Sequence, residues 1–270
     1  MVSNDQRRRQ LAREKFLRQQ QRRESARRRA RTRNTVIASA LAVVVVAGAG
    51  AFAAGAFDGK DTKDSAASKP SASPSKAADP CEKPAAGKVK PLSWKKEPAL
   101  TIDKSAGYTM NLATTCGDIG IGLKAKEAPH TVNSFAFLAG KGFFDHTKCH
   151  RLTTNGIYVL QCGDPKGTGA GGPGYTIPDE NLKDKSLKGN VYPAGTIAMA
   201  NTGQKHTGGS QFFLVYQDSQ LPPSYTPFGT ISDSGMKVLK KIAAAGESTG
   251  QGDGAPNATV VIDKATVKKS

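Results

Sequence analysis

The sequence predicts a mainly β fold for residues 99–270, an antiparallel barrel or sandwich with two helices. Short runs in which apolar and polar residues alternate recur from about residue 108 onward. Turn-forming residues such as Gly, Pro, Asn and Asp separate these runs, as they separate short strands. Only two segments have apolar residues at the 3.6-residue spacing of a helix, and they lie far apart in the chain.

The strands begin with a predicted hairpin of residues 108–114 and 119–123, because Cys116-Gly117-Asp118 between them is typical of a turn. Further strands are expected at residues 148–152, 157–161, 195–200, 211–216, 227–231 and 259–264. The two helices are expected at residues 128–141 and 234–245. Gly140 and Gly142 favour the end of the first helix.

A basic tail begins the chain. The net charge is +17, and the first 33 residues hold thirteen Arg and Lys against three acidic residues. We expect residues 1–35 to be a disordered cytoplasmic tail. Its place beside an apolar run favours attraction to anionic lipid headgroups, and we expect no nucleic acid partner.

Residues 36–57 form a run of 22 residues without a charge. About 20 apolar residues cross a bilayer as a helix, so this run predicts one transmembrane signal-anchor helix. Basic residues precede it and acidic residues follow it, so the positive-inside rule places the N-terminus in the cytoplasm and the rest outside the cell membrane. A cleaved signal peptide is the alternative, but its charged region and apolar core would both be unusually long.

A spacer follows the apolar run. Residues 58–98 are rich in Ser, Ala, Lys, Pro and Asp, and they have almost no large apolar residues before Leu92 and Trp94. Such a composition cannot form a core and predicts a flexible linker. The linker would hold the domain of residues 99–270 away from the membrane.

An ordered set of short motifs carries the chemical information. The set comprises Phe143-Phe144-Asp145, His150-Arg151, Gln161-Cys162-Gly163-Asp164-Pro165, Gly167-Thr168-Gly169, Gly171-Gly172-Pro173-Gly174, Asp179-Glu180, Met199-Ala200-Asn201, Gly209-Ser210-Gln211-Phe212-Phe213 and Phe228-Gly229. In this order the motifs resemble the cyclophilin-type peptidyl-prolyl cis-trans isomerases, over about residues 99–268. The anchor and spacer resemble the membrane-attached forms of actinobacteria. The resemblance implies a closed eight-stranded antiparallel β-barrel capped by two helices, with the active site on its outer face.

The resemblance also implies the site residues. The catalytic residues would be Arg151, Gln161 and Phe213. The residues that contact the peptide would be Tyr158, Val159, Ala200, Asn201, Gln211, Leu221 and Tyr225. The segment between Arg151 and Gln161 is two residues longer than in the well-known eukaryotic members. Gln220 stands where those members have a Trp that binds cyclosporin, so weak cyclosporin binding is expected.

These residue types suit the rotation of a prolyl peptide bond. Amide resonance opposes the rotation with a barrier of about 18–20 kcal/mol, and X–Pro bonds populate both isomers. A catalyst needs no nucleophile, cofactor or metal, only a fixed donor aimed at the prolyl nitrogen as it becomes pyramidal. Arg151 is such a donor, because its guanidinium is always charged and planar.

The expected function is therefore isomerisation of X–Pro bonds in exported or cell-surface proteins, by a monomer. A non-catalytic chaperone that binds proline-containing peptides in the same groove is the alternative.

Two other chemistries are disfavoured. Gly167–Gly172 fits a dinucleotide-binding pattern, but Pro173 follows at once and no helix is predicted there. A zinc site built from His146, Cys149, His150 and Cys162 is disfavoured because adjacent residues of a strand point to opposite faces.

The four cysteines, expected outside the cytoplasm, allow three disulfide pairings. Cys149 and Cys162 flank a predicted hairpin, which favours a Cys149–Cys162 bridge together with Cys81–Cys116. The second bridge would tie the end of the linker to the domain.

Overall fold

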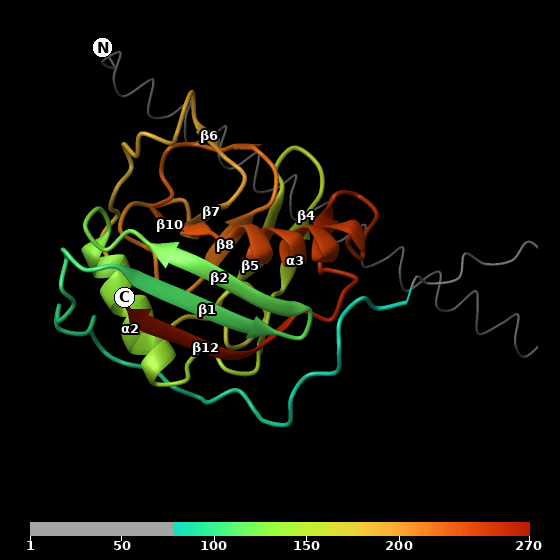
Figure 1. The fold of residues 1–270 in the computed structure, drawn as a ribbon, viewed down its shortest axis with the longest axis horizontal. Coiled ribbons are helices and arrows are strands. Elements are labelled where there is room, and N and C mark those ends of the chain that lie inside the picture. Colours follow the sequence, from blue (N-terminus) through green and yellow to red (C-terminus); the bar gives the residue numbers. More distant parts are fainter. Residues whose placement is uncertain (1–77) are drawn as a thin grey trace, which may run out of the picture. The chain divides into compact units, whose positions relative to one another are not determined.

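The computed structural model of this protein describes residues 78–270, which form one large antiparallel sheet, a small sheet of two strands and two helices (Figure 1). The strands are β1 (Tyr108–Thr114), β2 (Gly117–Leu123), β3 (Thr147–Lys148), β4 (Arg151–Thr153), β5 (Val159–Cys162), β6 (Val191–Tyr192), β7 (Thr196–Met199), β8 (Phe212–Val215), β9 (Ser219–Gln220), β10 (Pro227–Ile231), β11 (Asp253–Gly254) and β12 (Val261–Lys269). The helices are α2 (Pro129–Gly140) and α3 (Asp233–Ala244). The mainly β class with two helices is thus confirmed.

The predicted hairpin and both predicted helices are present nearly at their expected bounds. The strand expected at residues 148–152 is instead divided into β3 and β4. The chain changes partner there, because β3 pairs with β12 and β4 pairs with β5. The two-residue strands β6, β9 and β11 were not expected, since two residues are too few to show alternation.

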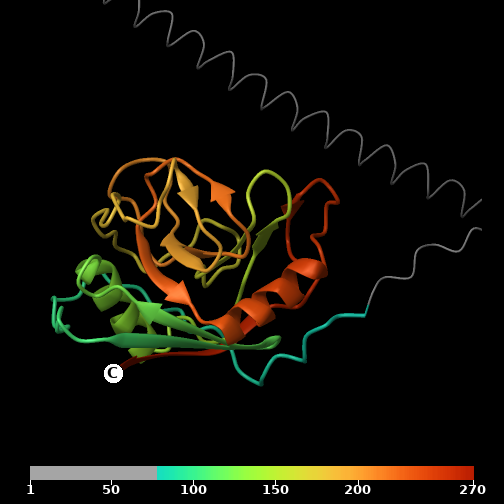
Figure 2. The ribbon, with the colours of Figure 1, turned by 45° about the horizontal axis from the view of Figure 1, so that its top comes forward.

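The large sheet is curled. Its strand order is β11-β4-β5-β8-β7-β10-β2-β1-β12-β3, so β3 lies at one end and β4 next to the other. Only Cys149 and His150 separate these two strands in the chain, so the two ends of the sheet must lie close together. Figure 2 shows the strands curving around an interior.

The sheet differs from the closed eight-stranded barrel that we expected. It has ten strands, and β6 and β9 form a second sheet of two strands. Within residues 78–270 no strand pairing joins β11 to β3, so the hydrogen-bonded ladder is open. The physical reason is the change of partner between β3 and β4, which leaves each of these short strands paired on a different part of the sheet.

The interior holds a cluster of aromatic rings. Phe135 of α2 lies 4.6 Å from Phe228, 5.3 Å from Phe144 and 5.6 Å from Phe212, measured between ring centroids. All four side chains are fully buried. Aromatic rings bury more apolar area than most side chains, so this cluster is a main source of the stability of the domain.

The N-termini of the two helices are capped by different side chains. The N-terminus of α2 meets the carboxylate of Glu180, which accepts hydrogen bonds from the backbone N–H groups of His130 and Thr131. An anion is favourable there because the first N–H groups of a helix lack partners within it. The side chain of Ser232 caps α3 by accepting a hydrogen bond from the N–H of Gly235. α2 packs on β12, and α3 packs on β2.

The stretch of residues 78–98, expected to be flexible, lies along the domain as the teal segment of Figure 1. The backbone N–H of Trp94 donates to the carbonyl of Pro173, and the indole ring of Trp94 lies 5.0 Å from the ring of Phe137. Cys81 is bonded to Cys116 in the turn between β1 and β2. The folded unit therefore begins well before residue 99. A bulky ring and a covalent bridge supply contacts that the polar composition of the linker did not reveal.

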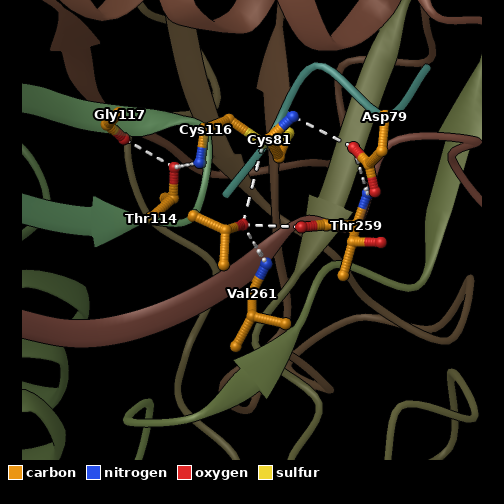
Figure 3. Close-up of a disulfide and its surroundings, with 8 residues drawn as sticks. Asp79, Cys81, Thr114, Cys116, Gly117, Thr259 and Val261 are labelled. Atoms are coloured by element: carbon orange, nitrogen blue, oxygen red, sulfur yellow. Dashed lines mark hydrogen bonds between the residues drawn. A yellow bond between two sulfur atoms is a disulfide. The ribbon is translucent and has the colours of Figure 1, made fainter. Parts of the chain in front are cut away.

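Figure 3 shows how Asp79 and Cys81 join the domain. The carboxylate of Asp79 accepts from the N–H groups of Cys81 and Thr259 at 3.0 Å each. The side-chain hydroxyl of Thr115 then donates to the carbonyl of Thr259 and accepts from the N–H of Val261. The segment thus shares one hydrogen-bond network with the start of β12.

The predicted basic tail and transmembrane helix lie outside the described residues. Within residues 78–270, neither helix combines the length and the apolar character needed to cross a bilayer.

Candidate active site

A row of side chains crosses four neighbouring strands on the outer face of the sheet. Arg151 of β4 is paired with Gln161 of β5, Gln161 with Phe213 of β8, and Phe213 with Ala198 of β7. Residues directly opposite each other in adjacent strands lie on the same face. Strand pairing alone therefore brings together a cation, an amide and an aromatic ring from distant parts of the sequence.

Alternation explains why this row faces outward. Residues adjacent to the row point inward, and Leu152, Leu160 and Phe212 are all fully buried in the main core. Val159, Phe213 and Val215 belong to a second, smaller apolar cluster on the outer face. The site thus rests on a small core of its own.

A pocket of about 220 Å³ opens beside Arg151. It is lined by Arg151, Ile157, Val159, Gln161, Ala200, Asn201, Phe213, Leu221 and Tyr225. Eight of these nine residues were expected in the site from the sequence. Six of the nine lining residues are aliphatic or aromatic, and Arg151, Gln161 and Asn201 add polar groups, an arrangement suited to a small ring such as that of proline.

The position of Tyr158 is the exception. The structure places Ile157 in the pocket, while the ring of Tyr158 packs 5.9 Å from the ring of Tyr216. Since Ile157 and Val159 are two residues apart, they share a face, and Tyr158 between them points away. The expectation that Tyr158 and Val159 both line the pocket was wrong for this reason. The alternation alone would have indicated Ile157.

Aromatic rings form one wall of the pocket. The ring of Phe213 lies 5.4 Å from that of Tyr225 in an edge-to-face arrangement. Behind them Tyr192 is fully buried, and its hydroxyl donates to the carbonyl of Tyr225 at 2.8 Å. Burial raises the pKa of Tyr192 to about 12, so the hydroxyl keeps its proton. Tyr192 therefore holds the loop that carries Tyr225.

Arg151 belongs to a continuous polar chain. Its Nε and Nη2 donate to the two carboxylate oxygens of Asp253 at 2.7 and 2.8 Å. Its Nη1 donates to Oε1 of Gln161 at 3.1 Å. Nε2 of Gln161 donates to Oε1 of Gln211, and Nε2 of Gln211 donates to the carbonyl of Gly171, both at 2.9 Å. Each group in the chain thus fixes the orientation of the next.

Asp253 is the member of this polar chain that the sequence did not reveal. Hydrogen bonds from Arg151 lower the pKa of Asp253, and the same bonds raise the pKa of Arg151. Both side chains are charged at neutral pH as a result. Asp253 lies 102 residues after Arg151, in a Gly-rich stretch without a motif, so no local signal indicated it.

Gln211 lies at the edge of a second and larger cavity. This cavity of about 570 Å³ shares Gln161, Ala200 and Asn201 with the first, and the glycine-rich loop of residues 169–174 lines it. Its wall mixes polar and apolar groups and is open to solvent, and the shared residues join the two cavities into one groove.

Asp164 holds the glycine-rich loop in place. Its buried carboxylate accepts hydrogen bonds from the N–H groups of Lys166, Thr168 and Gly169 at 2.7–2.9 Å. A Cβ atom on Gly171 would lie 1.9 Å from the same carboxylate, so only glycine fits there.

The side chain of Asn201 is engaged within the protein. Its Nδ2 donates to the carbonyl of Ser224 at 2.8 Å, and its Oδ1 accepts from the N–H of Gly203. The amide thereby fixes the loop between Leu221 and Tyr225 at the rim of the pocket. Asn201 shapes the groove from this position.

The structure pairs Cys149 with Cys162 and Cys81 with Cys116, the pairing favoured above. Cys149 and Cys162, two of the four residues weighed above as zinc ligands, are thus joined in a disulfide. Within residues 78–270, no cluster of His, Cys, Asp and Glu side chains is arranged to hold a metal ion.

Comparisons with known proteins agree with this geometry. Residues 109–267 match the family described as cyclophilin type peptidyl-prolyl cis-trans isomerase/CLD. The chain is similar to a "Probable peptidyl-prolyl cis-trans isomerase B" of Mycobacterium leprae, with 52% identity over 196 residues, which cover 70% of this chain and 62% of the relative. A protein of the same name from Mycobacterium tuberculosis is 46% identical over 198 residues, covering 70% and 60%. The chain thus spans about three fifths of the length of these two curated relatives.

A shorter relative and a solved structure cover the domain more completely. A peptidyl-prolyl cis-trans isomerase of Synechococcus elongatus is 38% identical over 133 residues, covering 48% of this chain and 86% of that protein. The crystal structure of a cyclophilin-type isomerase of Cryptosporidium parvum has a TM-score of 0.51 and 26% identity, covering 61% of this chain and 99% of its own. The chain belongs to the family of cyclophilin-type peptidyl-prolyl cis-trans isomerases.

Proposed function

We propose that this protein catalyses cis-trans isomerisation of X–Pro peptide bonds. One observation carries the proposal, namely an oriented guanidinium at the rim of a pocket that fits a proline ring. Phe213, Val159 and Leu221 would hold the ring, while Arg151 would donate to the prolyl nitrogen as the bond twists. A related cyclophilin of Cryptosporidium parvum was crystallised in the presence of the dipeptide Ala-Pro, which supports a proline-containing ligand.

Arg151 retains donors for this task. A guanidinium has five N–H groups. The bonds to Asp253 use two of them and the bond to Gln161 uses one. Within the described part of the chain, one N–H on each terminal nitrogen has no partner and would be available to the substrate. Because each is attached to a fixed plane, little reorganisation is needed when the prolyl nitrogen regains its lone pair.

The test is a protease-coupled assay of the full chain on a short Pro-containing peptide. We expect Arg151→Ala to lower kcat/KM by about ten-fold or more, which corresponds to about 1.4 kcal/mol of lost transition-state stabilisation. Lys237→Ala, which removes an exposed cation from α3, is the matched control and should leave turnover unchanged. Equal turnover by wild type and Arg151→Ala would contradict the proposal.

The non-catalytic chaperone remains the second candidate, because Asp253 neutralises part of the charge of Arg151. It predicts that the chain binds an unfolded Pro-rich client without accelerating isomerisation. If the wild-type chain binds such a client but isomerises the test peptide no faster than Arg151→Ala does, the chaperone function would be favoured over the enzyme.

We further propose that residues 36–57 anchor the protein in the cell membrane, with the domain outside the cytoplasm as a monomer acting on exported proteins. The charge-free run and the basic residues before it support the anchor. The two disulfides support an oxidising compartment. Digestion of the domain by protease added to intact cells would test this topology, and protection of the domain until the membrane is broken would contradict it.

A further inference from the structure

Asp253 meets the guanidinium of Arg151 with both carboxylate oxygens. The two donors, Nε and Nη2, lie on one side of the guanidinium and match the two oxygens at 2.7 and 2.8 Å. Such a paired geometry fixes the plane of the guanidinium as well as its position. The third bond, from Nη1 to Gln161, holds the same plane from the opposite side.

The backbone of Asp253 is fixed beside β4 by strand pairing. Asp253 is paired with Thr153 and Gly254 with Leu152 in the β11–β4 ladder. Asp253 therefore approaches Arg151 from the neighbouring strand. Gln161 approaches it from the strand on the other side of β4, so the guanidinium is held between two strands.

The loop that carries Asp253 is itself built around a buried carboxylate. Glu247, which is 8% exposed, accepts hydrogen bonds from the N–H groups of Thr249 and Gly252 at 2.6 and 2.7 Å. The hydroxyl of Thr249 donates to the carbonyl of Asp253 at 3.2 Å. The loop is thus organised by its own hydrogen bonds, and the position of Asp253 does not depend on Arg151 alone.

The carboxylate has two opposing effects on a donor. It reduces the positive charge that a developing lone pair would experience, which weakens the attraction. It also removes the rotational freedom of a long side chain that is 37% exposed, which favours the transition state. Among residues 78–270, two N–H groups of the guanidinium have no partner, and Arg151 lines the pocket, so we expect orientation to be the larger effect.

We propose that Asp253 is a positioning residue for catalysis, which holds the guanidinium of Arg151 in the plane required for donation to the prolyl nitrogen. The proposal rests on the proposed isomerase activity. Asp253 does not line the pocket, so it acts through Arg151 and not by contact with the peptide.

The experiment compares Asp253→Ala, Asp253→Asn, Arg151→Ala and the double variant Arg151→Ala/Asp253→Ala in the full chain. We expect Asp253→Ala to lower kcat by about five- to ten-fold with KM within about two-fold, because the pocket is unchanged. Asp253→Asn keeps one acceptor oxygen, so its kcat should lie between those of wild type and Asp253→Ala. In the Arg151→Ala background, removal of Asp253 should cause no further loss. Asp118→Asn, which neutralises an exposed carboxylate on β2, is the matched control.

The NMR signal of the Nε–H of Arg151 provides a readout independent of turnover. We expect it to be protected from solvent exchange in wild type and to exchange rapidly in Asp253→Ala. Wild-type kcat in Asp253→Ala, or an equal loss with and without Arg151, would overturn the inference. If wild type itself shows no turnover, the isomerase proposal fails and with it the catalytic role, whereas the Nε–H signal still reports whether the guanidinium is held.

Discussion

Two regions of this molecule are each secured by one disulfide, but they depend on it differently. The β4–β5 pair carries Arg151 and Gln161 and is held by strand pairing as well as by Cys149–Cys162. The segment of residues 78–98 has no strand or helix, and it is attached by Cys81–Cys116, by side-chain contacts and by isolated backbone hydrogen bonds such as that from Trp94 to Pro173. A bridge within a strand pair adjusts a geometry that already exists. We expect a bridge to a segment without secondary structure to contribute more to keeping that segment attached.

The surroundings of Trp94 support this comparison. Its ring packs against Phe137 and Phe143, and its N–H donates to Pro173, so it is the main apolar contact of the segment. Ser93 next to it lines the larger cavity. The segment thus reaches the larger cavity from outside the motif-bearing part of the chain. Trp94 is also the single tryptophan of the sequence, so its fluorescence reports on the segment alone.

The largest expected effect on stability concerns the N-terminal bridge. Its cysteines are 35 residues apart, and a loop of this size restricts the unfolded chain by about 4 kcal/mol. We expect Cys81→Ala/Cys116→Ala to lower the free energy of unfolding by up to this amount, measured by urea denaturation. Trp94 emission should shift to the red at lower urea than the far-UV circular dichroism changes. Coincident transitions would show that the segment does not detach separately.

Loss of the second bridge, Cys149–Cys162, should lower stability less and activity more than loss of Cys81–Cys116. Its separation of 13 residues corresponds to about 3 kcal/mol. Because it flanks Arg151 and Gln161, we expect Cys149→Ala/Cys162→Ala to lower kcat/KM by about five-fold, against less than about two-fold for the N-terminal pair. Alanine is chosen because all the sulfur positions but Cys81 are buried. A larger loss of activity in the N-terminal pair would reverse the comparison.

The smallest expected effect is a pH dependence of stability from His150, between the bridge and Arg151. Burial lowers the pKa of His150 below its ordinary value of 6.5, the charge of Arg151 lowers it further, and Asp164 opposes this. The unfolded chain therefore takes up the proton at a higher pH than the folded one. Stability from this group is fully present above pH 6.5 and falls as the pH decreases through the folded pKa.

We expect His150→Gln to make the free energy of unfolding less dependent on pH between about 7 and 5. Urea denaturation at several pH values measures this difference. The matched control is His206→Gln, since His206 lies on an exposed loop. An unchanged slope in His150→Gln would show that His150 does not contribute.

Much of the fold could be predicted because its elements have local signals. The alternation in residues 108–123 indicated the first hairpin, and the helical spacing before Gly140 indicated α2. The division of β3 from β4 could not be predicted, because the change of partner depends on how the whole sheet curls. The order in residues 78–98 was missed because it depends on one ring and one bridge within a polar composition.

The site divides in the same way. By itself, the sequence determined the family, the two helices, the alternation of the strands and the motifs that contain Arg151, Gln161 and Phe213. Only the tertiary structure decided that Ile157 lines the pocket in place of Tyr158, that Asp253 meets Arg151, and that Ser93 reaches the groove. Alternation, turns and helical spacing are set by neighbouring residues and can be read locally. The curl of a sheet and the approach of distant loops depend on contacts across the whole domain, which no short stretch of sequence contains.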